Sequence, residues 1–426
     1  MTEQTLPGPN NTLRRTLPNG ITILVRENFA SPAVIANGYL LVGSEDEPAG
    51  KHGLAGFTTD VMQRGTQRRP FSELYEQVES IGAGFGIGSG SHIASFGAKG
   101  LAEDFGLLLD ILGDVLMAPG FEPRQVERAR TEILTDLQER AHDTRRLARL
   151  AFYELAYPAE HPYHWSQIGY PDSIESITRA DLVEFYDMFF SPAGMVIAVV
   201  GGISADTAAA YVERTFGGWE TSRPQRTALP KVPKLTQTNE CRLTVHDKAQ
   251  SNLLLGWPGP ERTHSDFLPC SIANTILGVF GMYGRLGKSV REQHGLAYYI
   301  LSSLDGGNGP GPWSVQAGLD ATNVHQVIVL ILDELKRMQD TLVRADELAD
   351  TKSYLTGSLP LALETNEGVA RSLVNIERHA LGLDYLQRWA EMIQGITADQ
   401  IQAVAQRWLD PERFALAVAG PEEKAS

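Results

Sequence analysis

Residues Ile177–Gly202 read ITRADLVEFYDMFFSPAGMVIAVVGG, and residues Ile396–Pro421 read ITADQIQAVAQRWLDPERFALAVAGP. The two stretches align without a gap at a shift of 219 positions, so that Thr178 meets Thr397 and the prolines and glycines that follow also coincide. In each copy, the pattern predicts an amphipathic helix capped by threonine, a break at proline, and a buried strand that ends in glycine. Such a match favours a chain built from two copies of one structural plan.

A second match supports the same interpretation. At a shift of 222 positions, the paired residues are Arg130 and Lys352, Ile133 and Leu355, Leu137 and Leu359, Ala148 and Ala370, and Arg149 and Arg371. Chance explains either match alone more easily than it explains two matches at nearly the same shift. We therefore infer an internal duplication.

The duplication divides the 426 residues into two domains. The proline-containing segment Arg223–Lys234 has the composition of a linker. We predict an N-terminal domain over residues 1–222, a linker over residues 223–236, and a C-terminal domain over residues 237–426.

Each half begins with strand-like segments, continues with long helical patterns and closes with a strand. This order predicts an α+β fold in which each half is a mostly antiparallel sheet with helices packed on one face. The alternative is a single large α/β domain.

The composition is that of an ordinary globular protein, with 42% hydrophobic and 21% charged residues. The formal net charge of −15 argues against a nucleic-acid-binding protein, which normally carries a basic face. Cys241 and Cys270 are the only cysteines, too few for a disulfide scaffold, so we expect a cytoplasmic protein. The start, MTEQTLPGPNN, lacks a signal-peptide pattern, and the most apolar run, Met195–Gly201, is shorter than the roughly 20 residues that a membrane span needs.

The segment His52–Thr66, HGLAGFTTDVMQRGT, has apolar residues at helical spacing. On that helix, Gly56, Thr59 and Asp60 occupy positions i, i+3 and i+4 and therefore share one face. The segment resembles the zinc-binding helix of the M16 metallopeptidases (pitrilysin and mitochondrial-processing peptidase), which has a glycine-leucine-alanine lead-in, an H-x-x-E-H motif and a closing R-G-T. The resemblance covers essentially the whole chain. It implies two LuxS/MPP-like halves that form one unit, which pairs with a second such unit to enclose a cavity.

None of the four zinc-site positions of the family carries the family's own residue in this chain. The resemblance places the first histidine at Gly56, the catalytic glutamate at Thr59, the second histidine at Asp60 and the third ligand, a glutamate, at Asp136. Zinc needs imidazole or carboxylate donors and a general base beside its bound water, whereas glycine supplies no donor and threonine is a poor base near neutral pH. We therefore expect no metal in this chain and no peptidase activity of the chain alone. Asp60 and Asp136 leave open a weak site for a hard cation, against the alternative of two solvated or hydrogen-bonded aspartates.

Other histidines are weaker candidates for metal ligands. His161 and His164 have metal-like spacing, but Pro162 places them in a loop rather than on a helix. His92 is expected in a strand, and His52 lies outside the degenerate motif. We expect none of these four histidines to bind a metal ion.

The segment Gly284–Ile300, GRLGKSVREQHGLAYYI, carries a second resemblance to the M16 family. In the family, an arginine and a tyrosine seven residues later lie beside the substrate, and the matching positions are Arg291 and Tyr298. The local pattern predicts a helix that ends near Gln293, a reversal at Gly295, and then a strand. An arginine donates hydrogen bonds to peptide carbonyls, and a tyrosine hydroxyl stabilises the oxyanion of an attacked amide. The alternative is that the arginine complements the helix C-terminus and the tyrosine packs in the sheet.

Two further stretches are rich in glycine, Gly82–Ser91 (GAGFGIGSGS) and Gly306–Trp313 (GGNGPGPW). In the M16 family, the first region leads into an edge strand that pairs with the substrate backbone, although this chain lacks the asparagine-type motif that the family carries there. The second stretch is predicted to be a loop that connects or lines the interior or acts as a lid. It does not match a phosphate-binding loop, because no GK[ST] follows.

The resemblance implies a non-catalytic, substrate-binding subunit of a heterodimeric M16-type zinc endopeptidase. In this hypothesis, a homologous partner with an intact H-x-x-E-H motif holds the zinc, and Arg291 and Tyr298 orient an unfolded peptide at the partner's site. The alternatives are a structural subunit like the core subunits of respiratory cytochrome bc complexes, a stand-alone peptide-binding module, and a hydrolase that uses Asp60 and Asp136 with another metal. A homodimer remains open for the isolated chain.

Overall fold

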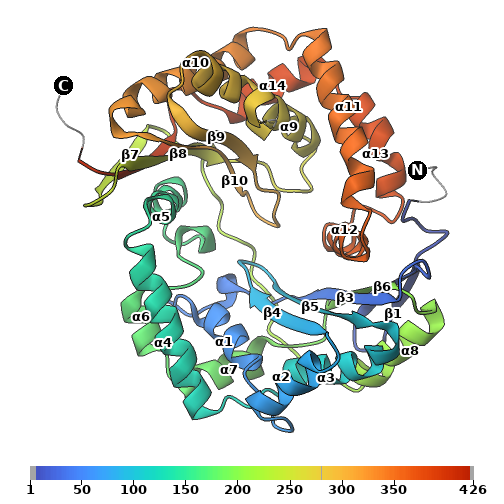
Figure 1. Cartoon of the computed structure of the whole chain (residues 1–426). Coiled ribbons are helices and arrows are strands. Elements are labelled where there is room, and N and C mark those ends of the chain that lie inside the picture. Colours follow the sequence, from blue (N-terminus) through green and yellow to red (C-terminus); the bar gives the residue numbers. More distant parts are fainter. Residues whose placement is uncertain (1–5, 280, 423–426) are drawn as a thin grey trace. The chain divides into compact units, whose positions relative to one another are not determined.

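A computed structural model describes residues 6–279 and 281–422 of the chain. The chain divides into two compact units (Figure 1). Unit 1 comprises the chain up to Asp136 together with residues 166–227 and 358–389, and unit 2 comprises residues 137–165, residues 228–357 and the chain from Ala390 onward. The first five residues, part of the stretch inspected for a signal peptide, and the last four residues of the predicted C-terminal domain lie outside the described residues.

The strands fall into one sheet in each unit. Unit 1 contains β1 (Leu13–Thr16), β2 (Thr22–Glu27), β3 (Ala33–Leu40), β4 (Gly84–Ser89), β5 (Ala94–Leu101) and β6 (Val196–Gly201). Unit 2 contains β7 (Asn239–Thr244), β8 (Gln250–Pro258), β9 (Ala297–Leu304), β10 (Pro312–Asp320) and β11 (Ala415–Gly420).

Helices account for most of the remaining chain. The α-helices before the linker are α1 (Leu54–Met62), α2 (Phe71–Glu79), α3 (Phe105–Met117), α4 (Pro123–Arg140), α5 (Thr144–Ala156), α6 (Pro171–Ser176), α7 (Arg179–Phe189) and α8 (Ala205–Phe216). After the linker come α9 (Phe267–Asn274), α10 (Val324–Asp340), α11 (Ala345–Ala362), α12 (Asn366–Arg378), α13 (Tyr385–Gln394) and α14 (Ala398–Trp408), with π-helical segments η5 (Thr275–Val279) and η7 (Gly287–Gln293). Among the described residues, no helix is both long and apolar enough to span a lipid bilayer.

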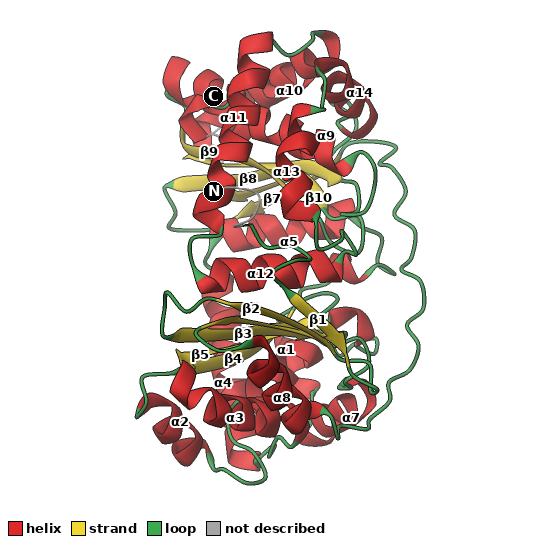
Figure 2. Ribbon diagram, turned by 90° about the vertical axis from the view of Figure 1, so that its right-hand side faces the viewer, coloured by secondary structure: helices red, strands yellow, loops and turns green. Residues whose placement is uncertain are grey.

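The sheet of unit 1 has the strand order β1-β2-β6-β3-β5-β4. Neighbouring strands are antiparallel except for β2 and β6, which are parallel. Helices α1, α2, α3 and α8 pack against this sheet, and α12 lies on the opposite side (Figure 2). Because successive residues of a strand point to opposite faces, alternate residues of β2, β3 and β6 form a core with α12. The contributing residues of α12 are Val369, Ala370, Leu373 and Ile376.

The sheet of unit 2 repeats this plan with the strand order β7-β11-β8-β10-β9. Only β7 and β11 are parallel. Helix α5 packs against β7, β8 and β11, where Ala148, Ala151 and Phe152 form a core with Ala415 and Ala417. Helix α9 and the π-helical segments pack against β9, and α10 packs against β10. The predicted fold class, two α+β halves with mostly antiparallel sheets, is confirmed.

The internal duplication is visible in the bounds of the elements. The bounds of α5 and α12 are related by the shift of 222 residues, as are those of α4 and α11. The bounds of α7 and α14, and of β6 and β11, are related by the shift of 219 residues. Thr178 and Thr397 cap the corresponding helices, because the side chain of each accepts a hydrogen bond from the backbone N–H three residues later.

The two units exchange one helix each relative to the halves of the sequence. Helix α5 comes from the first half but packs in unit 2, and α12 comes from the second half but packs in unit 1. Each sheet therefore has helices of its own half on one face and a single exchanged helix on the other. The chain changes unit at several places, and one of these junctions, between Thr227 and Ala228, lies inside the predicted linker of residues 223–236.

Candidate functional site

Helix α1 carries three of the four degenerate zinc positions, and its start is fixed by a carboxyl group. The N-cap Gly53 has a φ of 94°, a conformation that residues with side chains rarely adopt. The backbone N–H groups of Gly53 and Ala55 donate to the Glu47 carboxylate at 3.2 and 2.9 Å. Burial raises the pKa of Glu47 to about 8, although the two N–H donors oppose this shift.

Gly56 occupies the position of the expected first histidine. A Cβ atom there would lie 3.3 Å from the carbonyl oxygen of Gln167. The side chain of Gln167 is in turn held, because its amide donates to Ser91 Oγ at 2.7 Å. A side chain at residue 56 would therefore require a small shift of the loop that contains Gln167.

Thr59 occupies the position of the expected catalytic glutamate. Its side chain is buried, with an exposed fraction of 2%, and Oγ1 donates to the Gly56 carbonyl at 3.0 Å. The hydroxyl is thus used inside its own helix. It has neither the pKa nor the direction of a general base.

Asp60 is neutralised by an ion pair rather than by a metal. Both of its carboxylate oxygens accept from Arg64 Nη2, at 3.1 and 3.0 Å, and the same nitrogen lies 2.5 Å from Glu132 Oε2 on α4. Burial alone would lower the pKa of Arg64, but the two carboxylates outweigh it and raise the pKa, so the guanidinium stays charged. Asp136 is half-buried on α4, one turn after Glu132 and on the same face.

These residues do not fit a zinc ion. Gly56 has no donor atom, the Thr59 hydroxyl is committed to a backbone carbonyl, and Asp60 is bound to an internal cation. Over residues 6–279 and 281–422, no three or more histidine, cysteine, aspartate or glutamate side chains are grouped so that they could hold a metal ion. The pair of Asp60 and Glu132 with Arg64 also favours the hydrogen-bonded alternative for Asp60 over a site for a hard cation.

The second candidate segment has the predicted local structure. Segment η7 ends at Gln293, Gly295 reverses the chain with a φ of 64°, and β9 follows. Arg285, at the start of the candidate segment Gly284–Ile300, forms a two-pronged ion pair with Glu347 at 2.8 and 2.7 Å. Arg285 thereby fixes the segment to the first turn of α11, which gives this arginine a structural use.

Arg291 and Tyr298 have no such structural use. The side chain of Arg291 is half-buried and makes no hydrogen bond or ion pair with any residue that the structure describes. Tyr298 is 62% exposed, and its hydroxyl has no hydrogen-bond partner in the described part of the chain. The neighbouring Tyr299 points to the other face of β9, where its hydroxyl donates to Asn252 at 2.5 Å and its ring lies 4.7 Å from the Arg145 guanidinium. The fold therefore uses Tyr299 and leaves Tyr298 to solvent.

Two family models match the chain over most of its length. The model described as insulinase (peptidase family M16) matches residues 24–161, and the model described as peptidase M16 inactive domain matches residues 176–355. The chain belongs to peptidase family M16.

Relatives that match this M16 protein over most of their length include bacterial proteins and a plant protein. The uncharacterized zinc protease YmxG of Bacillus subtilis is 26% identical over 96% of this chain and 98% of its own length. An uncharacterized zinc protease of Mycobacterium leprae is 26% identical over 96% of this chain and 91% of its own length. A probable mitochondrial-processing peptidase subunit beta of Arabidopsis thaliana is 23% identical over 95% of this chain and 78% of its own length.

Solved structures support the same fold. A peptidase M16 inactive domain from Pseudomonas fluorescens superposes with a TM-score of 0.90 at 23% identity, covering 98% of this chain and 99% of that one. A protease from Helicobacter pylori superposes with a TM-score of 0.86 at 18% identity, covering 98% of this chain and 100% of that one.

The histidines of this M16 protein have other partners. His161 is buried, its Nδ1 accepts from the Tyr163 backbone N–H at 3.2 Å, and its ring stacks on Tyr157. His164 Nδ1 lies 2.8 Å from the Tyr157 carbonyl. The two histidines lie at the start and end of a short 3₁₀ turn, as the loop prediction requires, and their ring nitrogens contact different groups. The prediction that His92 lies in a strand is wrong, because it lies in the turn between β4 and β5.

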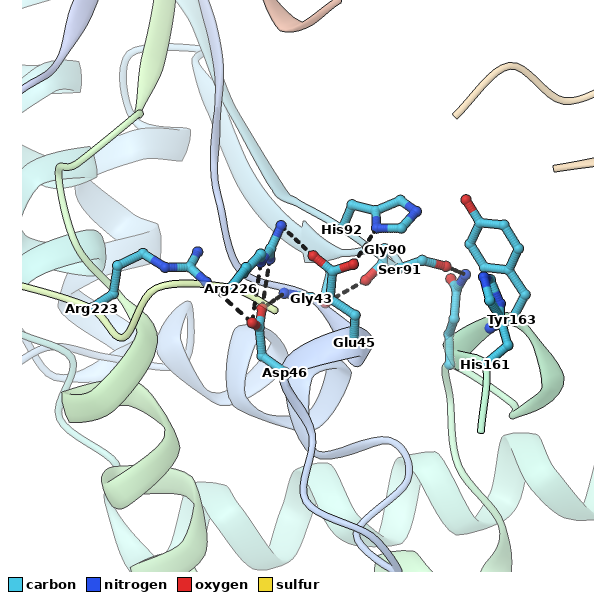
Figure 3. A network of polar contacts seen from close by, with 12 residues as sticks. Gly43, Glu45, Asp46, Gly90, Ser91, His92, His161, Tyr163, Arg223 and Arg226 are labelled. Carbon is cyan, nitrogen blue, oxygen red and sulfur yellow. Dashed lines mark hydrogen bonds and ion pairs between the residues drawn. The ribbon is translucent and has the colours of Figure 1, made fainter. Parts of the chain in front are cut away.

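His92 belongs to a buried network of charges in unit 1 (Figure 3). Its Nδ1 lies 2.5 Å from Glu45 Oε2. The carboxylate of Glu45 also contacts Arg226, which holds Asp46 at 2.6 Å, and Arg223 holds Asp46 at 3.1 Å. Burial alone would raise the pKa of Glu45, but His92 and the arginines outweigh it and lower the pKa. The network fixes the first residues of the linker to the loop after β3.

The two glycine-rich stretches have different structural roles. Gly82–Ser91 contains β4, which is an edge strand of its sheet, as expected from the family. Gly306–Trp313 contains the loop between β9 and β10. This loop is tied down, because the Pro310 carbonyl accepts from the Tyr157 hydroxyl at 2.9 Å and the Gly311 carbonyl accepts from the Gly259 N–H at 2.7 Å. These bonds favour a fixed connection over a lid.

The sequence analysis missed the residues that contact the predicted zinc-site positions. Arg64 stands four residues after Asp60, and this spacing on a helix is a signal for an ion pair that could have been read from the sequence. Glu132 and Glu47 offered no such signal, because their partners lie on a different element or across a loop. The role of Arg285 likewise depends on α11, which is distant in the sequence.

Proposed function

We propose that this M16 protein is the non-catalytic, substrate-binding subunit of a heterodimeric zinc endopeptidase. A homologous partner with an intact H-x-x-E-H motif would carry the zinc ion and the general base. This chain would supply Arg291 and Tyr298 to the peptide that is cleaved at the partner's site. The isolated chain would then bind no zinc and have no peptidase activity.

The observation that carries this proposal is a contrast within one chain. The side chains of Thr59 and Asp60, at two of the zinc positions, are committed to internal contacts with the Gly56 carbonyl and with Arg64. The side chains of Arg291 and Tyr298, in contrast, have no partner among the described residues. The guanidinium of Arg291 therefore has donors available to a ligand, and a peptide carbonyl or carboxylate is a suitable partner.

The relatives support a peptidase context. Those from Bacillus subtilis and Mycobacterium leprae are named zinc proteases, and the one from Arabidopsis thaliana is named a subunit of a mitochondrial-processing peptidase. A subunit implies a partner, and by analogy we assign this chain a partner of the same family. The cytoplasmic location stays a prediction.

The proposal is tested by co-expression with an M16 partner that carries H-x-x-E-H, using an unstructured fluorogenic peptide as substrate. We expect activity for the complex and none for either chain alone. Arg291→Ala should lower kcat/KM about ten- to hundredfold, the range for lost charge-assisted hydrogen bonds. Tyr298→Phe should lower kcat about 100-fold, as for loss of one donor to an oxyanion. Complex formation, measured by size-exclusion chromatography with light scattering, should be unchanged.

Matched controls separate these roles from general damage. Arg344→Ala removes an exposed arginine of unit 2 that pairs with Asp346, and Tyr283→Phe removes a hydroxyl from a tyrosine that is 90% exposed. Both variants should retain the turnover of the unmodified complex. Full turnover in Arg291→Ala and Tyr298→Phe would remove the substrate role and favour a structural subunit. Zinc-dependent cleavage by the chain alone would refute the proposal entirely.

A further inference from the structure

Edge strand β4 bears glycine at every second position. Gly84, Gly86 and Gly88 alternate along the strand and therefore share one face. The residues between them, Phe85 and Ile87, point to the other face, where the Phe85 ring lies 5.7 Å from Tyr75 of α2. One face of the strand is thus packed on helices, and the other face presents backbone only.

Nothing inside the described chain requires these glycines. A Cβ atom at Gly84 or Gly88 would meet no atom within 4 Å, and at Gly86 the nearest atom, Gln63 Oε1, would be 4.0 Å away. None of the three has a positive φ. Glycine within a strand is destabilising by roughly 0.5–1 kcal/mol relative to alanine, and in an edge strand it marks places where another backbone or a ligand approaches closely.

The neighbouring strand extends the bare surface. In the register of β4 with β5, Gly84 lies opposite Lys99, Gly86 opposite Gly97, and Gly88 opposite Ser95. Lys99 and Ser95 are exposed, and a Cβ atom at Gly97 would lie 2.7 Å from the side-chain oxygen of Asn37. We call the surface formed by Gly84, Gly86, Gly88, Ser95 and Gly97 the glycine shelf.

The glycine shelf lies on the face of the sheet that α12 covers farther in. Ile35 and Tyr39 of β3 lie opposite Lys99 and Ser95 of β5, and both belong to the core under α12. Helix α12 packs on β3 and β6 (Figure 1). The glycine shelf therefore lies between the core under α12 and the unpaired edge of β4. Large apolar side chains placed on the shelf would extend that core toward the edge.

At the edge of β4 that pairs with no other strand, one backbone carbonyl already accepts a hydrogen bond from a side chain. The side-chain amide of Gln63, just after α1, donates to the Ile87 carbonyl at 3.2 Å. A backbone N–H of a paired strand would make the same hydrogen bond. An extended peptide that replaces Gln63 would find both an acceptor at the edge and an open surface beside it.

We propose that the glycine shelf selects extended peptides that carry large apolar or aromatic side chains at every second position. This inference rests on the proposed function, because it assumes that the chain binds peptide. When a strand adds to β4, the residues opposite Gly84, Gly86 and Gly88 project onto the shelf. Large apolar side chains cover bare glycine backbone there and remove their own surface from water, and aromatic residues do so most effectively. Small or charged side chains gain nothing from this surface.

The test compares two isomeric, fluorescein-labelled peptides made of Phe, Ser and Gln. One carries Phe at every second position of its central segment, and the other carries the same Phe residues at every third position, so that they alternate between faces. We expect the first to bind the full chain, alone or in the co-expressed complex, about tenfold more tightly by fluorescence anisotropy. A version with N-methylated backbone amides, which cannot pair as a strand, should bind no more tightly than the second peptide.

Filling the shelf should abolish this preference without harming the fold. Gly84→Val combined with Gly88→Val places β-branched side chains into open space, so the thermal midpoint should stay the same or rise. The preference should fall from about tenfold to less than twofold. The matched control, Gly218→Val, changes a glycine that also has no atom within 4 Å of a Cβ and should keep the preference.

The outcomes separate the glycine shelf from the proposed function. Equal binding of both isomers, or an unchanged preference after Gly84 and Gly88 are filled, would overturn the shelf and leave the role of Arg291 intact if Arg291→Ala still lowers turnover. Tight binding of the N-methylated peptide would overturn pairing at β4. No peptide binding in either form, together with unchanged turnover of Arg291→Ala, would overturn both proposals.

Discussion

Glu47 lies just before α1, where its carboxylate accepts the backbone N–H groups of Gly53 and Ala55. Two effects act on the pKa of this carboxyl group in opposite directions. Burial favours its neutral form and the N–H donors favour its charged form, and burial dominates, which raises the pKa to about 8. The start of the degenerate zinc helix is therefore sensitive to pH.

Glu47→Gln should remove part of the pH dependence of stability. Because the folded-state pKa is raised above the ordinary value near 4.5, the folded state holds the proton more tightly than the unfolded state does. The stabilisation is complete below pH 4.5 and is lost as the pH rises through 8. Within this window, the unfolding free energy of the unmodified protein should fall relative to that of the variant, by up to about 1.4 kcal/mol per pH unit.

Urea unfolding at several pH values across this window provides the measurement. Glu76→Gln, on the exposed face of α2, is the control and should follow the unmodified protein. Parallel stability profiles for the unmodified protein and Glu47→Gln would show that Glu47 does not hold its proton in the fold.

At the scale of the element, the interior glycines of α1 and α11 lie in different surroundings. Gly56 of α1 would place a Cβ atom 3.3 Å from the Gln167 carbonyl, whereas Gly357 of α11 would meet nothing within 4 Å. Helical propensity alone favours alanine over glycine by about 1 kcal/mol at both positions. The difference between the two positions therefore reports the contact with the loop that contains Gln167.

Gly357→Ala should raise the thermal midpoint by about 2–4 °C, the shift that 1 kcal/mol produces in a unit of this size. Gly56→Ala should raise it by less than half as much, because the loop has to move. Differential scanning calorimetry measures both shifts, and each variant is the control for the other. An equal gain at Gly56 would mean that Gln167 does not restrict this position, and a larger side chain there would then be tolerated.

At the scale of the whole molecule, each unit depends on a helix from the other half of the sequence. Without α12, the sheet of unit 1 would expose the apolar residues of β2, β3 and β6 that now form its core. Without α5, the sheet of unit 2 would expose β8 and β11. The halves of the sequence are therefore not independent folding units, although each carries a nearly complete copy of the plan.

Residues 6–227 and residues 228–422, expressed separately, should aggregate or bind a hydrophobic dye, because each fragment lacks one covering helix. Co-expressed fragments should assemble into a soluble complex with the secondary structure of the intact chain. The control is the full chain with a protease site inserted at residue 228, which should stay assembled after cleavage. A fragment that is monomeric, folded and free of dye binding would contradict the exchange of helices.

Local patterns predicted much of this protein. The spacing of apolar residues, the threonine caps and the glycine stops act over a few residues, so the repeated helices and strands could be predicted from the sequence together with their duplication. The lack of a metal-donor side chain at Gly56 and of a general base at Thr59 was equally visible, because it depends only on which residue types are present. So was the reversal at Gly295, which needs a residue that tolerates a positive φ.

Only the tertiary structure showed which sheet each repeated helix covers and which polar side chains lack a partner among the described residues. No local pattern in α5 or α12 named the sheet that each covers, and the exchange is seen only in the packing of the folded chain. Tyr298 and Tyr299 are adjacent residues of the same type. Because side chains alternate between the faces of β9, the hydroxyl of Tyr299 contacts Asn252 and that of Tyr298 is exposed. The burial of a side chain and its hydrogen-bond partners depend on residues that are distant in the sequence, whereas helix and strand patterns depend on residues that are close in the sequence.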